Sequence, residues 1–246
     1  MSLERMPAPM GGEPAPPGIG DAGIGGSRAA LQLQVLATEH WGLLATRSLA
    51  WNESFTRAGM FLSALSGAIV ALALVAQATE FGNEFTLFAL VILPVVLFIG
   101  VTTFVRMGTS NQYDAQCVIG MNRIRHAYTQ IVPEVEPYLV MGTHDDQKSI
   151  NLSMGMAPQR TSFLVDVIVS TPFVVCAINS VIGGVIVTLL AQLLGLDTAP
   201  AIGLAVVGVL VVFGLQAVTA SRSIAAYVAA QEPKFPAPQE ATEAAE

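Results

Sequence analysis

The sequence predicts an all-α polytopic membrane protein with four transmembrane helices, arranged as two hairpins with long cytosolic helical extensions. The chain of 246 residues is 53% hydrophobic and only 12% charged, whereas roughly 25% of the residues of a soluble domain are charged. Four apolar runs occur, at residues 58–78, 86–105, 171–194 and 199–220. Each holds about 20 residues, the length at which a helix crosses the hydrocarbon core of a bilayer.

The basic residues predict the orientation of these four spans. All 11 Lys and Arg residues lie before the first span, between the second and the third, or after the fourth. The connections near 79–85 and 195–200 contain no basic residue, only Glu80, Glu84 and Asp197. Because Lys and Arg are retained in the cytosol during membrane insertion, we expect a multi-pass protein of the plasma (inner) membrane with both termini cytoplasmic.

The segments on the cytosolic side comprise two tails and a helical stalk. Residues 1–27 and 232–246 are rich in Pro, Gly, Ala and Glu and lack an apolar core, so we expect both to be disordered. Residues 28–57 contain no Pro and extend the first span inward as an amphipathic helix, and helical spacing extends the second span through residues 106–131. The two extensions predict an antiparallel stalk about 35–40 Å long, which makes 28–140 one unit.

The rest of the chain is expected to contain a loop and the second hairpin. Residues 141–160 are polar and contain several Gly, Ser and Asn residues, which predicts a cytosolic loop. Residues 161–231 contain the third and fourth spans. Of the two tryptophans, Trp51 is expected at the inner membrane interface, and Trp41 is expected to pack inside the stalk.

Polar residues in and beside the third span are the candidates for a conduction pathway. No ionisable residue lies in the middle of a span, which argues against a proton-coupled transporter. Asp166 precedes the third span, either as part of a carboxylate ring at the inner mouth of an oligomer or as a first-turn carboxylate favoured by the helix dipole. Asn179, followed by Ser180, either lines a pore or makes an interhelical hydrogen bond, the more ordinary use of an intramembrane Asn. Gln216 is expected to be hydrated near a span end.

Small residues recur every four positions on the first and fourth spans. Such stripes let helix backbones approach closely, within one chain or between copies. The residues concerned are Ser63, Gly67 and Ala71 on the first span, and Ala217, Ser221 and Ala225 at the end of the fourth.

Catalytic and cofactor motifs are not found in the sequence. It has no HExxH, GxSxG or phosphate-binding glycine motif, and no Cys-His cluster. His144 precedes two Asp residues in the predicted loop, and His40 and His126 are expected to face each other in the stalk, but neither arrangement supplies the three or four fixed ligands of a metal site. We therefore expect no enzyme activity, no cofactor and no metal, and the net charge of −7 excludes a basic surface for nucleic acid.

Two segments resemble known membrane proteins. The runs "ATEHWGLLATRSLAWNESFTRAGMFLSALSGAIVALALVAQ" and "NQYDAQCVIGMNRIRHAYTQIVPEVEPYL" resemble a group of uncharacterised actinobacterial-type four-span membrane proteins. Over residues 30–140 they are also distantly similar to SLATT-type bacterial domains, which have two transmembrane helices with long cytosolic flanking helices. That resemblance implies a membrane or pore-forming effector role, whereas the second hairpin is not part of the two-span pattern.

These observations support two hypotheses. The first is a homo-oligomeric ion channel or pore-forming protein of the lipid bilayer. The second is a non-conducting membrane anchor or scaffold whose helical stalk binds a cytosolic protein partner. Short outer connections and long inner helices are compatible with both, and the candidate polar residues on the third span slightly favour the first.

Overall fold

The computed structural model describes residues 19–155 and 163–238. Within these ranges the chain is helical throughout its regular structure and contains no β-strand. The elements are α1 (Ile19–Thr79), α2 (Asn83–Ile131), the 3-10 helix η1 (Pro133–Tyr138), α3 (Gln147–Ser153), α4 (Phe163–Ile168), α5 (Thr171–Leu193) and α6 (Thr198–Ala229).

Four of the described helices, α1, α2, α5 and α6, are long and apolar enough to cross a membrane. In a bilayer every backbone N–H and C=O group must be satisfied within the protein, which a helix achieves by itself. The predicted fold class, an all-α polytopic membrane protein with four spans in two hairpins, is thus confirmed.

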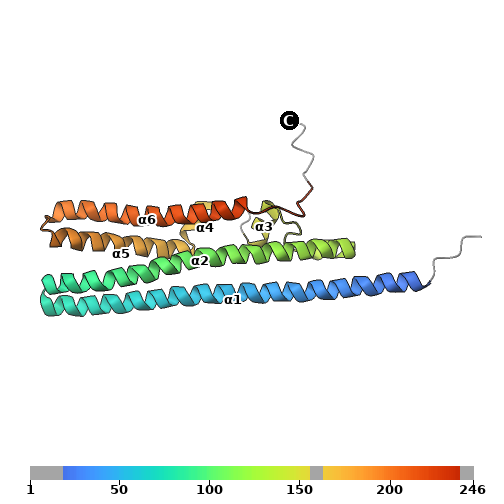
Figure 1. The fold of residues 1–246 in the computed structure, drawn as a ribbon, viewed down its shortest axis with the longest axis horizontal. Coiled ribbons are helices and arrows are strands. Elements are labelled where there is room, and N and C mark those ends of the chain that lie inside the picture. Colours follow the sequence, from blue (N-terminus) through green and yellow to red (C-terminus); the bar gives the residue numbers. More distant parts are fainter. Residues whose placement is uncertain (1–18, 156–162, 239–246) are drawn as a thin grey trace, which may run out of the picture.

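The two hairpins lie side by side with both tight turns at the same end of the molecule (Figure 1). Packing follows the order α1, α2, α5, α6, with α2 in contact with both α1 and α5. At the end opposite the turns, α1 and α2 continue beyond the second hairpin (Figure 1). The 61 residues of α1 correspond to about 90 Å of helix, roughly three times the thickness of the hydrocarbon core.

The helix boundaries agree with the sequence over the spans and differ outside them. The expected helix 28–57 runs without interruption into the first span, but α1 already begins at Ile19, inside the expected tail. Extending an existing helix by a turn requires no new nucleation, so a Gly-rich stretch can join it. In the second span α2 continues through Pro94, and it ends at Ile131, where the predicted extension 106–131 also ends.

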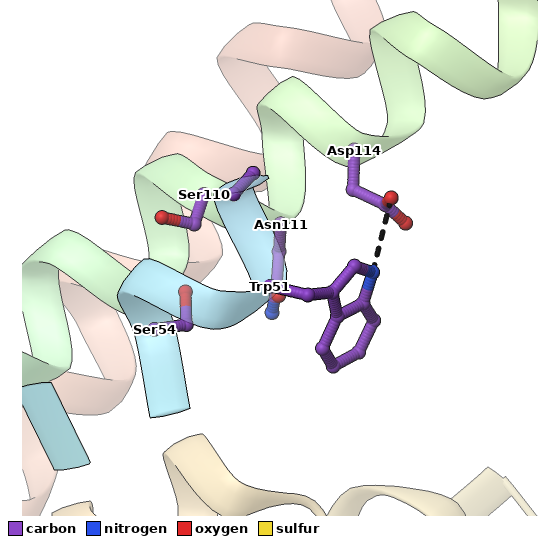
Figure 2. A pocket seen from close by; sticks show the side chains of 6 residues that line it. Trp51, Ser54, Ser110, Asn111 and Asp114 are labelled. Carbon is purple, nitrogen blue, oxygen red and sulfur yellow. Dashed lines mark hydrogen bonds between the residues drawn. The ribbon is translucent and has the colours of Figure 1, made fainter. Parts of the chain in front are cut away.

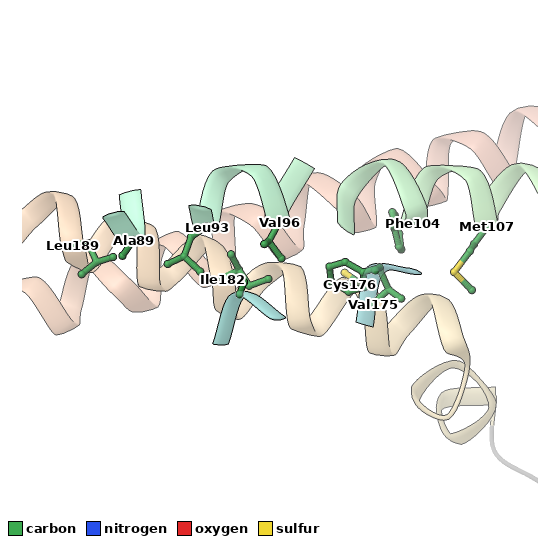
Figure 3. Close-up of a cluster of buried hydrophobic side chains, with 11 residues drawn as sticks. Ala89, Leu93, Val96, Phe104, Met107, Val175, Cys176, Ile182 and Leu189 are labelled. Carbon is green, nitrogen blue, oxygen red and sulfur yellow. The ribbon is translucent and has the colours of Figure 1, made fainter. Parts of the chain in front are cut away.

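The membrane core lies between α2 and α5. Side chains of the two helices point toward one another along the bundle (Figure 3). The buried cluster consists of Phe61, Ala68, Ala89, Leu93, Val96, Phe104, Met107, Val175, Cys176, Ile182 and Leu189. Since lipid tails are as apolar as these side chains, close van der Waals packing rather than exclusion of water stabilises this contact in the bilayer.

Glycines bring α5 and α6 together. A Cβ atom on Gly184 would lie 3.0 Å from the carbonyl oxygen of Ala205, and one on Gly208 would lie 3.3 Å from the Cα atom of Gly184. Neither position has room for a side chain, so the two backbones approach closely, as is typical of small residues at membrane helix interfaces.

The stalk is a two-stranded helical pair in which α1 presents every seventh residue to α2. His40 stacks near Tyr128, Arg47 pairs with Asp114, and Ser54 and Phe61 are buried. These four α1 residues are spaced by seven, the repeat of a coiled-coil seam. The polar residues at the aqueous positions of this seam restrict the register in which α1 and α2 can pair.

The predicted loop 141–160 is partly helical, and this prediction was wrong. Helix α3 forms because Asp146 caps its N-terminus by accepting a hydrogen bond from the backbone N–H of Ser149 at 2.8 Å. Ile150 and Ser153 are then buried against the rest of the protein. A short polar segment can thus be ordered when its capping residue and its few apolar residues find partners. Amino-acid composition alone does not reveal such contacts.

Both hairpin turns contain left-handed backbone, but at different types of residue. After α5, Gly195 adopts a φ of 78° and ends the helix with its N–H bonded to Gln192, as glycine commonly does. After α1, Glu80 and Phe81 take φ values of 49° and 58°. Left-handed backbone at non-glycine residues costs about 1 kcal/mol or more each, so the first turn is the more strained of the two.

The packing at Gly100 generates a stability prediction. A Cβ atom there would overlap with Asn179 Oδ1 and lie 2.7 Å from Phe61 Cε2. We expect Gly100→Ala to lower the free energy of unfolding by about 1–3 kcal/mol, the usual cost of overpacking. The control is Gly108→Ala on the same helix, where nothing lies within 4 Å and the higher helix propensity of Ala should stabilise by up to about 1 kcal/mol. Unfolding by SDS titration in mixed micelles measures both, and equal effects would contradict the packing.

Candidate functional site

The pore candidate Asn179 is fully buried and pairs with the neighbouring helix. Its Nδ2 donates to Gln216 Oε1 at 2.9 Å, and the side chain has no exposed surface. The expectation that Gln216 is hydrated was wrong, because its side chain turns inward and is 6% exposed. Within one chain Asn179 therefore joins α5 to α6. This is the interhelical hydrogen bond that the sequence offers as the alternative to a pore-lining role.

The other two candidates from the third span lie apart from each other. Ser180 is 2% exposed and donates to the carbonyl oxygen of Cys176 at 2.7 Å, within its own helix. Asp166 belongs to α4, which is separated from α5 by Val169 and Ser170, so it does not stand on the spanning helix itself. Within the described residues, Ser180 thus contacts its own helix and does not face a polar channel.

The small-residue stripes lie mostly on the outside of the bundle. Ser63 and Gly67 on α1 are exposed, as are Ala217, Ser221 and Ala225 on α6, whereas Ala71 is half-buried. A Cβ atom on Gly67 would meet nothing within 4 Å. Packing inside the chain uses other glycines. The small-residue stripes therefore form two apolar surfaces, one on α1 and one on α6, that lack large side chains.

A charged cluster joins the two stalk helices next to the membrane. The Asp114 carboxylate is buried and accepts hydrogen bonds from Arg47 Nε and Nη2 and from Trp51 Nε1, at 2.5, 3.2 and 3.2 Å. Figure 2 shows the indole of Trp51 turned toward Asp114, with Ser54 and Ser110 beside them. Such charge-assisted bonds are about twice as strong as neutral ones, so this cluster fixes the register of α1 against α2.

A second ion-pair cluster lies one to two turns closer to the spans. Glu53 Oε1 accepts from Arg57 Nε and from Arg106 Nε, each at 3.0 Å, and Glu53 Oε2 accepts from Arg106 Nη2 at 2.9 Å. The i,i+4 pair of Glu53 and Arg57 follows from sequence spacing, whereas the partner on α2 does not. Hydrogen bonds from Arg106 and then Arg57 lower the pKa of Glu53 to about 2.

The far end of the stalk is tied to the C-terminal segment by Asp145. Its buried carboxylate accepts hydrogen bonds from the backbone N–H groups of Lys234 and Phe235, each at 2.8 Å, and from Arg123 Nε at 2.7 Å. The backbone N–H of Asp145 in turn donates to the Phe235 carbonyl at 3.2 Å. We call these contacts the C-terminal latch. The expected disordered tail 232–246 is therefore held in place over the part that the structure describes, up to residue 238.

The latch is built for an ionised carboxylate. Burial raises the pKa of Asp145, but the hydrogen bonds from Lys234, Arg123 and Phe235 more than offset it, so the pKa lies below its ordinary value. A carboxyl group with a lowered folded-state pKa stabilises the protein fully above its unfolded pKa. This contribution is lost as the pH falls through the folded-state value.

Asn122 connects the latch to α2. The residue is completely buried, and its Nδ2 donates to the carbonyl oxygens of His144 and Ser149 at 3.0 and 3.3 Å. Its Oδ1 accepts from Arg125 Nη1 and Ser153 Oγ at 2.7 and 2.8 Å. All four hydrogen-bonding positions of the amide are thus used, which holds the segment before α3 and α3 itself on α2.

A groove of about 690 Å³ lies next to the latch, between the ends of α1 and α2. Its walls are Leu31, Gln32, Val35 and Leu36 from α1, Arg123, His126, Ala127, Gln130 and Ile131 from α2, and Phe235. The ring of Phe235 stacks on His126 at a centroid distance of 5.0 Å. The sequence predicts that His40 faces His126, which is wrong: the His40 ring lies 6.5 Å from that of Tyr128. His126 is two residues from Tyr128 and therefore points to another side of α2, where it contacts Phe235 and His144.

Large apolar side chains also line the outside of the stalk. Trp41 is 69% exposed, so its expected packing inside the stalk was wrong. His40 and Leu43, on either side of Trp41 in the sequence, contact α2, so the Trp41 indole points away from α2. Leu31, Val35 and Leu49 are 62%, 60% and 69% exposed. Groups of three or more His, Cys, Asp or Glu residues that could hold a metal ion do not occur among the described residues.

Comparisons with protein-family models, with curated proteins and with solved structures gave no match for this chain. The class that the fold defines is therefore that of a multi-pass helical membrane protein with a helical stalk. The resemblance to SLATT-type domains stays a prediction from the sequence.

The latch generates a prediction for limited proteolysis. Asp145→Ala removes two hydrogen bonds to the segment around Lys234, so trypsin should cleave after Lys234 at least about tenfold faster, which corresponds to losing roughly 1.4 kcal/mol or more of protection. The cleavage is followed by mass spectrometry of the full chain in detergent. Glu136→Ala is the matched control, since Glu136 is exposed on η1 and leaves the latch intact. Unchanged cleavage in Asp145→Ala would show that the latch does not order the segment.

Proposed function

We propose that this protein is a membrane-anchored scaffold whose stalk, α1 residues 28–57 with α2 residues 106–131, binds a cytosolic protein partner. The observation that carries the proposal is the groove at the far end of the stalk, whose walls include the exposed Leu31 and Val35, together with the exposed Trp41 on the same helix. Monomeric soluble surfaces rarely expose apolar patches of this kind unless they bind something.

Lipid cannot cover these side chains. Trp41 lies 17 residues before the first span at residue 58, which is about 25 Å along the helix. The headgroup layer adds only about 5–8 Å to each side of the hydrocarbon core. Burial of a fully exposed Leu or Val side chain contributes about 1.5–3 kcal/mol, so a partner with an apolar segment gains affinity from filling the groove.

The polar groups of the bundle also favour an anchor over a conduit. Asn179 donates to Gln216 inside the chain, and the lipid-facing surfaces of α1 and α2 are formed by residues such as Ile69, Leu74 and Val91. The orientation of the protein in the membrane is part of the same proposal. The one-sided distribution of Lys and Arg favours a stalk on the cytosolic side of the plasma membrane.

The scaffold proposal predicts a position-specific contact. A photo-crosslinking amino acid at Val35, in the full chain in its native membranes, should form adducts with another protein. The same amino acid at Tyr138, which is 81% exposed but outside the groove, is the control and should not. Leu31→Glu should abolish the Val35 adduct by placing a charge in the groove. Equal adducts at both positions, or adducts only between copies of the chain, would contradict a partner-binding groove.

An oligomeric pore is the second candidate function. It is supported by the exposed small-residue stripes, which let helices of neighbouring copies approach closely, as an assembly of several copies requires. In this arrangement Asp166 lies at the inner mouth, and Asn179 stabilises the helix that carries Ser180.

The pore predicts a measurable current. Purified protein in planar bilayers should show a cation-biased conductance that Asp166→Ala reduces, since a carboxylate ring concentrates cations, and that Asn179→Leu abolishes. Asp197→Ala, at the opposite turn, is the control for a charge change elsewhere. A silent bilayer with wild-type protein, or currents unchanged in both variants, would remove the pore from consideration.

A further inference from the structure

Two arginines from different helices converge at the membrane boundary. Arg57 lies directly before the first span, which begins at residue 58, and Arg106 lies directly after the second, which ends at residue 105. Both guanidinium groups bond to the same oxygen, Glu53 Oε1, at 3.0 Å. Because the helices are antiparallel neighbours, the two positive charges lie at one level, where the hydrocarbon core gives way to lipid headgroups.

The cluster has positive charge and hydrogen-bond donors to spare. With its pKa at about 2, Glu53 is ionised at neutral pH, so two guanidinium groups and one carboxylate leave a net charge of +1. Arg57 uses only Nε in its bond to Glu53, and Arg106 uses Nε and Nη2. The Arg57 and Arg106 side chains are 48% and 46% exposed, and each guanidinium has five N–H donors, so several donors face outward.

An aromatic pair on the same helix marks the same level independently. Trp51 and Phe55 stack with ring centroids 5.6 Å apart and are 45% and 56% exposed. Amphipathic rings of this kind gather at the headgroup region of membrane proteins. Since the Trp51 indole is held by Asp114, the ring stays at a fixed depth beside the arginines.

We propose that Arg57 and Arg106 form a binding site for the phosphodiester of an anionic lipid headgroup. The guanidinium fork matches the oxygen geometry of a phosphate better than an ammonium group does. Glu53 holds the two forks side by side before the lipid arrives, which lowers the entropy lost on binding. The net charge selects lipids that carry a negative charge over zwitterionic ones. The site does not depend on whether the stalk binds a partner or copies form a pore.

The test uses Trp51 as a reporter in the full chain. Trp41→Phe leaves Trp51 as the sole tryptophan, and the protein is reconstituted in phosphatidylcholine vesicles. Quenching of its fluorescence is compared for phosphatidylglycerol and phosphatidylcholine that carry brominated acyl chains, at equal mole fractions. We expect about fivefold preferential binding of phosphatidylglycerol, the effect of one net positive charge at a lipid surface. Equal quenching by the two lipids would overturn the proposal.

Two variants separate a lipid site from a merely structural ion pair. Arg57→Gln with Arg106→Gln should abolish the preference. Glu53→Gln removes the shared acceptor but leaves both cations, so the preference should persist. If Glu53→Gln loses it as completely as the double variant does, the arginines act through the ion pair and the proposal fails. A circular dichroism spectrum of wild-type helicity is required of each variant.

A soluble anion distinguishes the source of the phosphate. Excess inorganic phosphate should leave the preference intact, because a membrane lipid is present at high local concentration beside the site. Loss of the preference with inorganic phosphate would assign the site to free phosphate and overturn its assignment to lipid. Retention of the preference in the double variant would place lipid selection elsewhere on the protein.

Discussion

The packing of α2 against α1 on one side and α5 on the other is the interaction on which the rest of the structure depends. The second hairpin contacts the stalk-bearing hairpin chiefly through α2, and α3 and η1 pack on α2 as well. Because apolar side chains gain nothing by leaving lipid for protein, the α2–α5 contact depends on the fit of residues such as Val96 and Ile182. This explains why Gly100, at the point where Phe61 and Asn179 meet α2, has no space for a larger residue.

The same helix pair uses different interactions on the two sides of the membrane boundary. Inside the spans, α1 contributes the apolar residues Phe61 and Ala68 to the buried cluster that it shares with α2 and α5. Beyond the boundary the seam carries Arg47 with Asp114, and Glu53 with Arg106. Ion pairs are inexpensive in the headgroup and aqueous regions and costly in hydrocarbon. The change of interaction therefore fixes how deeply the hairpin can sit in the bilayer.

Most of the fold could be predicted from the sequence, because the bilayer requires each spanning helix to be about 20 residues long and apolar. Such segments can be recognised from the sequence alone. The four spans follow from apolar runs, and the continuation of α1 and α2 beyond them follows from helical spacing and from the absence of proline in residues 28–57 and 106–131. The C-terminal latch could not be predicted, since Asp145 and Phe235 are 90 residues apart and the segments around them have the composition of loops. Asn179 stands out in the sequence as an amide inside a span, but its partner Gln216 cannot be identified there, because the direction of the Gln216 side chain toward α5 depends on the rotation of α6.

The ion-pair cluster at the membrane boundary and the groove could likewise be predicted only in part. Glu53 and Arg57 are related by helical spacing, so local sequence predicts their pairing. Arg106 joins them only because the short turn after Thr79 sets the register of α2 against α1. Leu31, Val35 and Trp41 are apolar residues in a predicted helix, and the sequence predicts that Trp41 packs inside the stalk. Only the position of the seam with α2 shows that they face outward.

The uninterrupted course of α1 makes it a lever. Residues 19–57 extend about 58 Å beyond the first span, and the last part of this length continues past the end of α2 (Figure 1). A transmembrane helix changes its tilt when the thickness of the surrounding bilayer changes. A change of about 5° at the membrane displaces the far end of such a rod sideways by about 5 Å. A small adjustment to the lipid environment is thus amplified at the groove, where it shifts Leu31 and Val35 sideways over the membrane surface.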